Sequence, residues 1–89
     1  MTTKQHNQWF VYILLCADDT YYTGITNNIK KRLAQHKAGT GAKYTQAHGA
    51  KEIVHVEEFP DRQSASVREY KIKQLSRIGK LKIINRYSN

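Results

Sequence analysis

Cysteine is scarce in this sequence, and hydrophobic runs long enough to cross a bilayer are absent. Cys16 is the only cysteine, which excludes a disulfide framework and a zinc site built from cysteines. Residues 1–8 are polar, so the sequence predicts no signal peptide, and no apolar run approaches the roughly 20 residues of a membrane-spanning helix. We therefore expect a cytoplasmic protein that does not bind membranes.

Motifs for nucleotide cofactors, zinc or serine-type catalysis are missing as well. Gly39, Gly41 and Gly49 form neither a P-loop nor a dinucleotide fingerprint, because the strand, glycine-rich turn and helix of such motifs do not surround them. The four histidines do not have the spacing of zinc ligands. No Ser-His-Asp arrangement can be argued from spacing.

Acidic residues are missing from two long segments of the chain. None occurs between Asp19 and Glu52 or after Glu69, although both segments are rich in lysine and arginine. The whole chain has fifteen Lys and Arg against seven Asp and Glu, a formal net charge of +8. Such segments form a surface that attracts polyanions, so we expect a nucleic-acid partner. The alternative is a small soluble protein that merely happens to be basic.

Strand-like and helix-like segments follow one another in a pattern that predicts an α+β domain. The apolar segment 10–16 is expected to be the central strand, because both of its faces would be covered. Thr26, Asn27 and Asn28 offer cap oxygens for one helix and Asp61 for another, and Gly39, Gly41 and Pro60 are stop signals. The predicted elements are strands at 10–16, 21–25 and 52–59, a loop at 42–50 with a short helical turn near 43–45, and helices that follow residue 28 to about 37, run from about 61 to 76, and run from 80 to 87.

This order, strand, strand, helix, strand, helix, helix, predicts a small three-stranded antiparallel sheet flanked by helices. Residues 1–8 are expected to be a polar tail and residues 9–87 a single domain, since a chain of 89 residues supports one core. Any functional site must then lie close to that core.

Two polar residues fall on the side of the first predicted helix that must be buried. Arg32 and His36 share that side at about 100° per residue. Ile29 and Leu33 define it as the apolar side. Each polar residue alone is compatible with a structural role, because arginine often extends from the edge of an apolar stripe. As a pair they also suit a phosphate, with the guanidinium as a bidentate clamp and the imidazole as a proton acceptor.

A glutamate lies at the border of the apolar stripe of the second predicted helix. Ala65, Ile72 and Leu75 define this stripe, Arg68 lies within it, and Glu69 lies at its edge. Glu69 could pair with Arg68 or a lysine as a structural ion pair. It could equally present its oxygens to a divalent metal, because Mg²⁺ commonly takes one or two protein carboxylates and keeps several waters.

Two tyrosines in the predicted hairpin share a face only in one kind of register. Tyr12 and Tyr22 lie on the same side of the sheet if the connecting loop has an odd number of residues, for example Asp18-Asp19-Thr20. A two-residue turn would place them on opposite faces. Either tyrosine alone could simply belong to the core.

Taken in order, these residues resemble the GIY-YIG endonuclease superfamily. Phe10-Val11-Tyr12 is similar to the Gly-Ile-Tyr signature and Tyr22-Thr23-Gly24 to the Tyr-Ile-Gly signature, with Phe10 in place of glycine and Thr23 in place of isoleucine. The segments "NNIKKRLAQH" and "SASVREYKIKQL" resemble the arginine helix and the metal-glutamate helix of the family. The match runs from about residue 9 to residue 85 and is similar to short stand-alone bacterial members, close to the junction-cutting, structure-specific branch.

The resemblance implies a divalent-metal-dependent endonuclease that hydrolyses phosphodiester bonds in DNA, including branched or damaged DNA in repair or recombination. It implies that Tyr12 is the general base, with Tyr22 orienting the nucleophile or the phosphate. His36 would be the proton relay and Arg32 the clamp on the transition state. Glu69 would hold one Mg²⁺ or Mn²⁺ ion, and the implied set ends with Asn85, which would complete the site.

The basic segments supply lysines and an arginine expected to bind nucleic acid, with DNA as the expected partner. The stretch "GTGAKYTQ" also resembles the junction-cutting branch, which implies that Lys43, Tyr44 and Thr45 lie near the substrate. The residues expected to bind nucleic acid are Lys30, Lys31, Lys37, Lys43, Tyr44, Thr45, Arg68, Lys71 and Lys73. Larger relatives carry an added DNA-binding domain, so a protein partner is one source of specificity for this chain. A non-catalytic DNA- or RNA-binding module with the same fold, and a basic ribosome-associated protein, are the alternatives.

Overall fold

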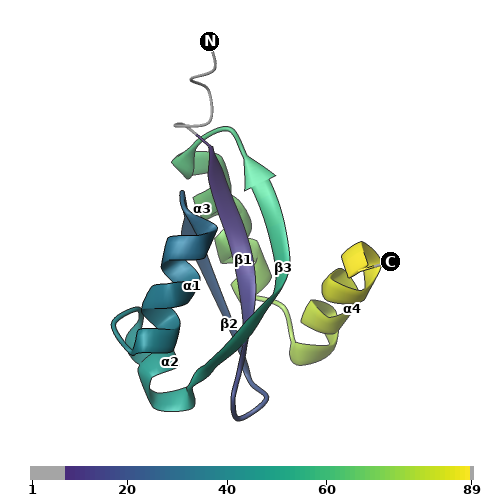
Figure 1. The fold of residues 1–89 in the computed structure, drawn as a ribbon. Coiled ribbons are helices and arrows are strands. Elements are labelled where there is room, and N and C mark those ends of the chain that lie inside the picture. The colour runs from purple at the N-terminus through teal and green to yellow at the C-terminus, as the bar shows by residue number, and fades with distance from the viewer. Residues whose placement is uncertain (1–7, 89) are drawn as a thin grey trace.

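A three-stranded antiparallel sheet forms the centre of the molecule (Figure 1). The computed structural model describes the backbone of residues 8–88 and the side chains of residues 8–84. Strand β1 (Trp9–Cys16) lies between β2 (Tyr21–Thr26) and β3 (Ala50–Phe59) and pairs antiparallel with both. The predicted fold class and the central position of the first strand are thus confirmed.

Helices cover both faces of this sheet. Helix α1 (Ile29–Ala38) follows the hairpin, α2 (Lys43–His48) precedes β3, and α3 (Arg62–Lys73) and α4 (Arg77–Ser88) complete the chain. Figure 1 shows α1 and α2 on one side of the sheet and α3 behind it. No helix in the part of the chain that the structure describes is long and apolar enough to cross a membrane.

The central strand is apolar throughout because each of its faces meets a different helical layer. Val11 and Ile13 point to one side, where they pack with Ala65 and Ile72 of α3. The residues between them in sequence point to the other side, toward α1: Tyr12, Leu14 and Cys16 pack there with Ile29 and Leu33. This period-2 division places every even-numbered residue of β1 on the α1 side.

Local capping residues fix the helix starts that the sequence predicted. The Asn28 side chain accepts a hydrogen bond from the Lys31 backbone N–H, and the Asp61 side chain accepts one from Ser64. Gly39 ends α1 in the left-handed conformation, with φ of 80°. These caps agree with the predicted helices after residues 28 and 61.

Three predictions on the helical side were wrong. Segment 42–50 was expected to be a loop with a brief turn, but Lys43–His48 forms α2. Helix α3 ends at Lys73 rather than near residue 76, and α4 starts at Arg77 rather than at residue 80. The reason is Ser76, whose hydroxyl accepts a hydrogen bond from the Gly79 backbone N–H, as an N-cap residue does.

The β1–β2 hairpin has a three-residue loop, which sets the register of the two tyrosines. Residues 17–19 form the loop, with Asp19 at φ of 67°, and the Cys16 N–H donates to the Thr20 carbonyl at 2.8 Å. Tyr12 then lies opposite Gly24, and Leu14 lies opposite Tyr22. The odd loop length puts both tyrosines on the same face, the one covered by α1.

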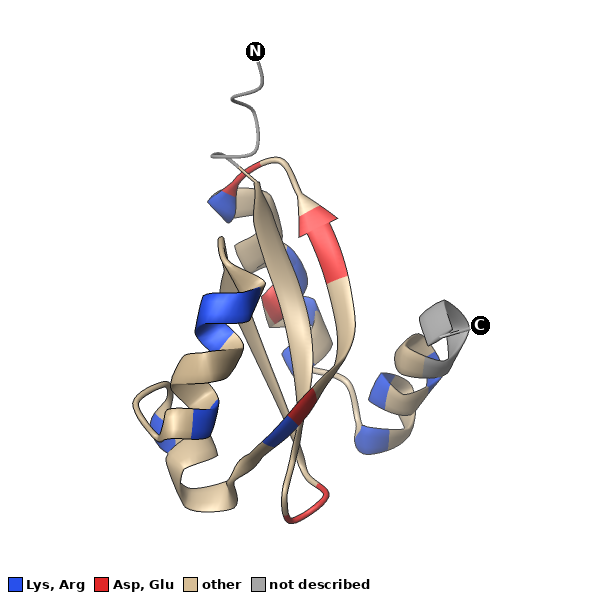
Figure 2. Cartoon of the chain, in the orientation of Figure 1, with Lys and Arg blue, Asp and Glu red and all other residues tan. Residues whose placement is uncertain are grey.

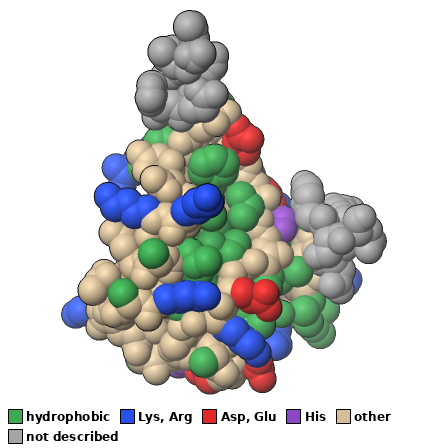
Figure 3. Space-filling model, in the orientation of Figure 1, with side chains coloured by type: hydrophobic (Ala, Val, Ile, Leu, Met, Phe, Trp, Pro, Cys, Tyr) green, Lys and Arg blue, Asp and Glu red, His purple; other side chains and the backbone are tan. Residues whose placement is uncertain are grey.

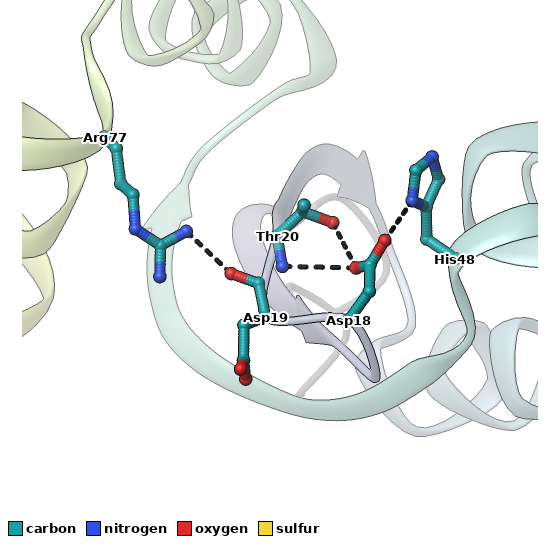
Figure 4. A network of polar contacts seen from close by, with 5 residues as sticks. All are labelled: Asp18, Asp19, Thr20, His48 and Arg77. Atoms are coloured by element: carbon teal, nitrogen blue, oxygen red, sulfur yellow. Dashed lines mark hydrogen bonds and ion pairs between the residues drawn. The ribbon is translucent and has the colours of Figure 1, made fainter.

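Side chains from two distant segments hold this loop in place (Figure 4). Asp18 accepts hydrogen bonds from the backbone and hydroxyl of Thr20 and forms an ion pair with Nδ1 of His48 at the end of α2. The hydrogen bonds from His48 and Thr20 lower the pKa of Asp18 to about 2. Arg77 donates to the Asp19 carbonyl at 2.6 Å. The loop that sets the register is therefore tied to both helical layers.

Candidate active site

The centre of the site is a buried pair formed by a tyrosine and a histidine. The Tyr12 hydroxyl lies 2.7 Å from Nε2 of His36, and the two residues are 0% and 1% exposed. Strand β1 places Tyr12 on the α1 face, and the third turn of α1 places His36 over it. The sequence predicted that Arg32 and His36 share the buried side of α1, and it left open which face of the sheet Tyr12 occupies.

A threonine on α2 fixes the tautomer of this histidine. Nδ1 of His36 lies 2.7 Å from Oγ1 of Thr45, and the same hydroxyl donates to the Ala42 carbonyl at 3.0 Å. Because its only proton is used in that bond, the Thr45 hydroxyl accepts from His36, which must carry its proton on Nδ1. Nε2 is then the free acceptor, so the Tyr12 hydroxyl donates to it.

Arginine 32 lies beside the same hydroxyl. Nε of Arg32 approaches the Tyr12 oxygen at 3.4 Å, and Nη1 donates to Oε1 of Gln35 at 3.1 Å. The bond to Tyr12 raises the already high pKa of Arg32, so the guanidinium is permanently charged. A fixed positive charge thus faces the tyrosine oxygen on the side not occupied by His36.

The ionisation states follow from burial and from this charge. Burial raises the pKa of Tyr12, the bond to Arg32 lowers it, and the charges of Tyr22 and Glu69 raise it. Burial, and then the charge of Arg32, lowers the pKa of His36 from its usual 6.5. Near pH 7 the pair is therefore a neutral phenol that donates to a neutral imidazole.

An aromatic row continues from the pair toward solvent. The Tyr22 ring centroid lies 6.3 Å from that of Tyr12 and 5.4 Å from that of His36. Tyr44 of α2 stacks on Tyr22 at 5.8 Å, and His48 stacks on Tyr44 at 4.0 Å. Tyr22 is only partly buried, so its ring lies between the buried pair and the exposed Tyr44.

Two glycines make room for the pair. A Cβ at Gly24 would lie 2.6 Å from the Tyr12 hydroxyl oxygen and 2.8 Å from Cζ of the same ring. A Cβ at Gly41 would lie 2.5 Å from Nδ1 of His36. Gly24 is the glycine of the second tyrosine signature, and its lack of a side chain lets the Tyr12 ring cross the neighbouring strand.

Glu69 approaches from α3, which packs against β1 and β2 on the other side of the sheet. Its side chain is 22% exposed and pairs with Lys73 at 3.2 Å, so the structural ion pair considered from the sequence is present. Its negative charge also acts on Tyr12. Among the described residues no three His, Cys, Asp or Glu side chains cluster as a metal cage. A partly exposed carboxylate whose partner is an exposed lysine fits a hydrated Mg²⁺ or Mn²⁺ ion, since such an ion takes only one or two protein carboxylates.

The remaining predicted residues are not gathered at one place. Arg68 makes two hydrogen bonds to Glu57 of β3, at 2.8 and 3.0 Å, which commits it to the α3 side of the sheet. Thr45 is 1% exposed and bonded to His36, which corrects the expectation that it touches nucleic acid directly. The lysines are exposed on the helices: Lys30, Lys31, Lys37, Lys43, Lys71 and Lys73. Asn85 lies outside the described side chains.

Lysine and arginine residues are frequent on the helices around the Tyr12–His36 pair. Figure 2 shows Lys and Arg on α1, α2 and α3, and Figure 3 shows Lys and Arg side chains on both sides of an apolar strip in the middle of the viewed face. Acidic residues on this view lie mainly in the β1–β2 loop and on β3. The charge asymmetry expected from the sequence is therefore present on the surface that adjoins Tyr12 and Arg32.

The fold and the convergence of two tyrosines, an arginine and a histidine on one face of the sheet define a GIY-YIG type of domain. A model of the GIY-YIG catalytic domain matches residues 8–82, and the chain belongs to this nuclease-type family. Within the family it is similar to UPF0213 proteins.

Three UPF0213 proteins illustrate that similarity. The one from Natronomonas pharaonis is 48% identical over 75 residues, which cover 84% of this chain and 88% of that protein. The one from Oceanobacillus iheyensis is 49% identical over 77 residues, covering 86% and 90%. The solution NMR structure of the one from Bacillus halodurans is 38% identical, with a TM-score of 0.59 and coverage of 90% and 85%. The expected likeness to the junction-cutting branch stays a prediction.

Proposed function

We propose that the protein is an endonuclease that hydrolyses phosphodiester bonds in DNA with the help of one divalent metal ion. The observation that carries this proposal is the buried pair in which the Tyr12 hydroxyl donates to Nε2 of His36. A phenol with a pKa near 10 is a poor base near pH 7 unless it can pass on its own proton. The neutral imidazole, fixed by Thr45, is placed to receive that proton.

The chemical step follows from this geometry. A water molecule gives a proton to the Tyr12 oxygen while the Tyr12 proton moves to Nε2 of His36. The oxygen of that water forms a bond to phosphorus, and the bond from phosphorus to the 3′ oxygen breaks with its electron pair on that oxygen. The 3′ oxygen takes a proton from a solvent water molecule, and His36, which ends the step as an imidazolium, returns its proton to the resulting hydroxide.

Arg32 and Tyr22 are the groups that would position the phosphate. The guanidinium of Arg32 beside the Tyr12 oxygen can make charge-assisted hydrogen bonds to two phosphate oxygens. The Tyr22 ring packs near both Tyr12 and His36, so its hydroxyl can orient the water or the phosphate. When the phosphate binds, the donors of Arg32 and Tyr22 would replace water around it. Because these donors are held in place, they would stabilise the negative charge of the transition state more strongly than mobile water does.

Glu69 is the residue that would hold the metal ion, with Asn85 as the predicted addition. A Mg²⁺ or Mn²⁺ ion there would supply charge compensation for the phosphate and the leaving oxygen. The present partner of Glu69 is Lys73, an exposed side chain that can swing away at little cost. The proposed substrates are branched or damaged DNA in repair or recombination, which the basic α1 side would bind through phosphates.

Cleavage assays with a carboxylate variant test this proposal. Glu69→Gln keeps the size of the side chain and removes the charge that would hold the metal ion. Glu58→Gln, an exposed change on β3, is the matched control. Branched, flapped and single-stranded DNA and a single-stranded RNA would each be incubated with Mn²⁺ or Mg²⁺, and DNA affinity would be measured separately without metal.

We expect cleavage of DNA by the wild type and by Glu58→Gln, and none by Glu69→Gln, with DNA affinity retained in all three. Equal cleavage by Glu69→Gln would contradict the metal assignment. Binding without cleavage by the wild type on every substrate would favour a non-catalytic module that keeps the fold. Cleavage of RNA alone would move the substrate class away from DNA.

A further inference from the structure

A cleft of about 330 Å³ opens beside the candidate site, where β2 ends and α1 begins. Its walls come from the start of β1, the end of β2, the first half of α1 and the start of α3. Trp9 and Ile25 contribute apolar surface, and Asn27 and Asn28 contribute amide groups. Its volume lies at the lower end of the roughly 300–1,000 Å³ typical of small-ligand pockets.

Positive charge dominates the lining of this cleft. Lys31, Arg32 and Arg62 line it, and no Asp or Glu does. Among the residues that the structure describes, neither Lys31 nor Arg62 has an ion-pair partner. Figure 2 shows the basic first turns of α1 at the same end of the molecule as the start of α3. A cleft lined by one sign of charge concentrates the opposite charge, so its ligand should be anionic.

Trp9 holds one of these cations in place. The guanidinium of Arg62 lies over the Trp9 ring, 5.5 Å from its centroid. Trp9 itself packs against the core cluster of Val11, Ile13 and Ala65, which fixes the ring. A cation–π contact uses the flat face of the guanidinium and leaves its N–H donors free at the edge, where an anion can accept them.

Arg32 joins the cleft to the candidate site. Its Nε faces the Tyr12 hydroxyl, and its Nη1 donates to Gln35, which is another lining residue of the cleft. One guanidinium therefore forms the boundary between two neighbouring anion sites. A nucleic-acid strand presents its phosphates at regular intervals, so two such sites in sequence match adjacent positions on one strand.

We propose that this cleft binds the phosphodiester and nucleoside next to the scissile phosphate, so that the DNA strand runs from Tyr12 across Arg32 to Lys31 and Arg62. This inference rests on the proposed function for the identity of the strand. It adds that the protein binds the substrate strand on one side of the scissile bond, and that Lys31, Arg62 and Trp9 make this contact.

The chain provides its own reporter for the test, because Trp9 is its only tryptophan. The intact protein would be titrated with a short single-stranded DNA without metal, so that binding is followed without cleavage, and Trp9 emission would be excited selectively over tyrosine. The titration would be repeated with the same oligonucleotide carrying a 5′-terminal phosphate. Comparing the two shows whether the cleft binds an internal phosphodiester or a terminal phosphate. A change in Trp9 emission that saturates with either oligonucleotide is the expected result.

Charge variants locate the contact. Lys31→Gln and Arg62→Gln each remove one cleft cation, and Lys82→Gln removes an exposed charge on α4 that does not line the cleft. We expect the two cleft variants to weaken binding roughly three- to tenfold and to lower the salt slope by about one. Lys82→Gln should change both quantities distinctly less, and its Trp9 response should stay that of the wild type.

The failures of the two proposals are distinguishable. DNA that binds without changing Trp9 emission, or a loss with Lys82→Gln as large as with Lys31→Gln, would overturn the cleft assignment even if the protein cleaves DNA. A response that requires a terminal phosphate would overturn the assignment to an internal phosphodiester. A Trp9 response that depends on Lys31 and Arg62 in a protein that cleaves nothing would support the cleft and contradict the nuclease proposal.

Discussion

The Tyr12 hydroxyl donates a 2.7 Å hydrogen bond to Nε2 of His36, and the direction of that bond is set by Thr45 on a third element. A buried tyrosine with only a packing role would need a hydrogen-bond partner for its hydroxyl, and any donor or acceptor could serve. Here the partner is a titratable ring with its acceptor nitrogen facing the phenol. Arg32 lies on the other side of the same oxygen, so the phenol connects a charge to a proton acceptor.

Replacing Thr45 tests whether it positions His36. Thr45→Val is nearly isosteric but removes the acceptor for the Nδ1 proton, so either tautomer of the imidazole becomes accessible. We expect cleavage to slow on the order of tenfold. Unfolding in urea should show a loss of about 1–3 kcal/mol, because a buried N–H is left without a partner.

Thr45→Ser is the matched control, since it keeps the hydroxyl and loses only a methyl group. Its cleavage rate should return most of the way to that of the wild type, while part of the stability loss remains. If the serine variant were as slow as the valine variant, the tautomer explanation would be wrong and packing of α2 would be the better account.

The pH dependence of cleavage should report His36. Its pKa is lowered from 6.5 by burial and by Arg32, and it must be neutral to accept the Tyr12 proton. The rate should therefore be constant near pH 7 and fall as pH decreases through a midpoint below 6.5. In His36→Gln, which cannot titrate, the rate should be lower and this acidic limb should disappear; a limb that persists would belong to another group.

Folding stability should change over the same pH range with a defined sign. The unfolded chain binds a proton at His36 near pH 6.5, whereas the folded chain binds it only at lower pH. The unfolded state therefore holds more protons as pH falls below 6.5, and the free energy of unfolding should decrease there. The difference between wild type and His36→Gln, measured by urea unfolding from pH 7 to about pH 5, isolates this contribution.

The glycines next to the site offer a paired test. Gly41→Ala would place its Cβ 2.5 Å from Nδ1 of His36, so the imidazole must move away from Tyr12 or Thr45. Gly39→Ala has no atom within 4 Å but a φ of +80°, so it strains the end of α1 only. We expect Gly41→Ala to lose most cleavage, and Gly39→Ala to lose about 1–2 kcal/mol of stability while cleaving normally. Equal activity of the two variants would argue against the importance of the His36 position.

Arg68 should behave as a structural residue. Its two hydrogen bonds to Glu57 hold α3 against β3, and Glu57 also contacts His55. Arg68→Gln should lower the free energy of unfolding by about 1–3 kcal/mol, as expected for charge-assisted bonds that are partly buried. The exposed change Lys71→Gln should leave it nearly unchanged. If Arg68→Gln lost more free energy of DNA binding than free energy of unfolding, the result would instead support the predicted contact between Arg68 and nucleic acid.

The parts of the fold that local chemistry determines could be predicted from the sequence. Asn28 and Asp61 carry cap oxygens that act on residues three positions ahead, so two helix starts were predicted. Ser76 also acts as a cap, but in sequence it was included in the preceding helix. Helix α2 has only six residues, too few for a hydrophobic period, and its position depends on the bond between Thr45 and His36.

The site was predictable as a set of residues and less so as a geometry. Helical periodicity placed Arg32 and His36 on one face, but only the three-residue loop decided that Tyr12 shares this side with Tyr22. The segment "GTGAKYTQ" contains both Gly41 and Thr45, yet nothing local shows that they surround an imidazole. Those contacts depend on where α2 packs in the folded protein. The residues next to α2 in the sequence do not determine that position.

The cleavage rate of Tyr12→Phe, measured with saturating DNA and a divalent metal ion, tests the central claim most directly. The change removes one oxygen, leaving His36 without its donor partner, and Tyr21→Phe on the opposite face is the control. We predict that Tyr12→Phe stays folded and binds DNA as the wild type does, but cleaves about 10²- to 10⁴-fold more slowly, whereas Tyr21→Phe cleaves normally. Cleavage by folded Tyr12→Phe at the wild-type rate would contradict the account.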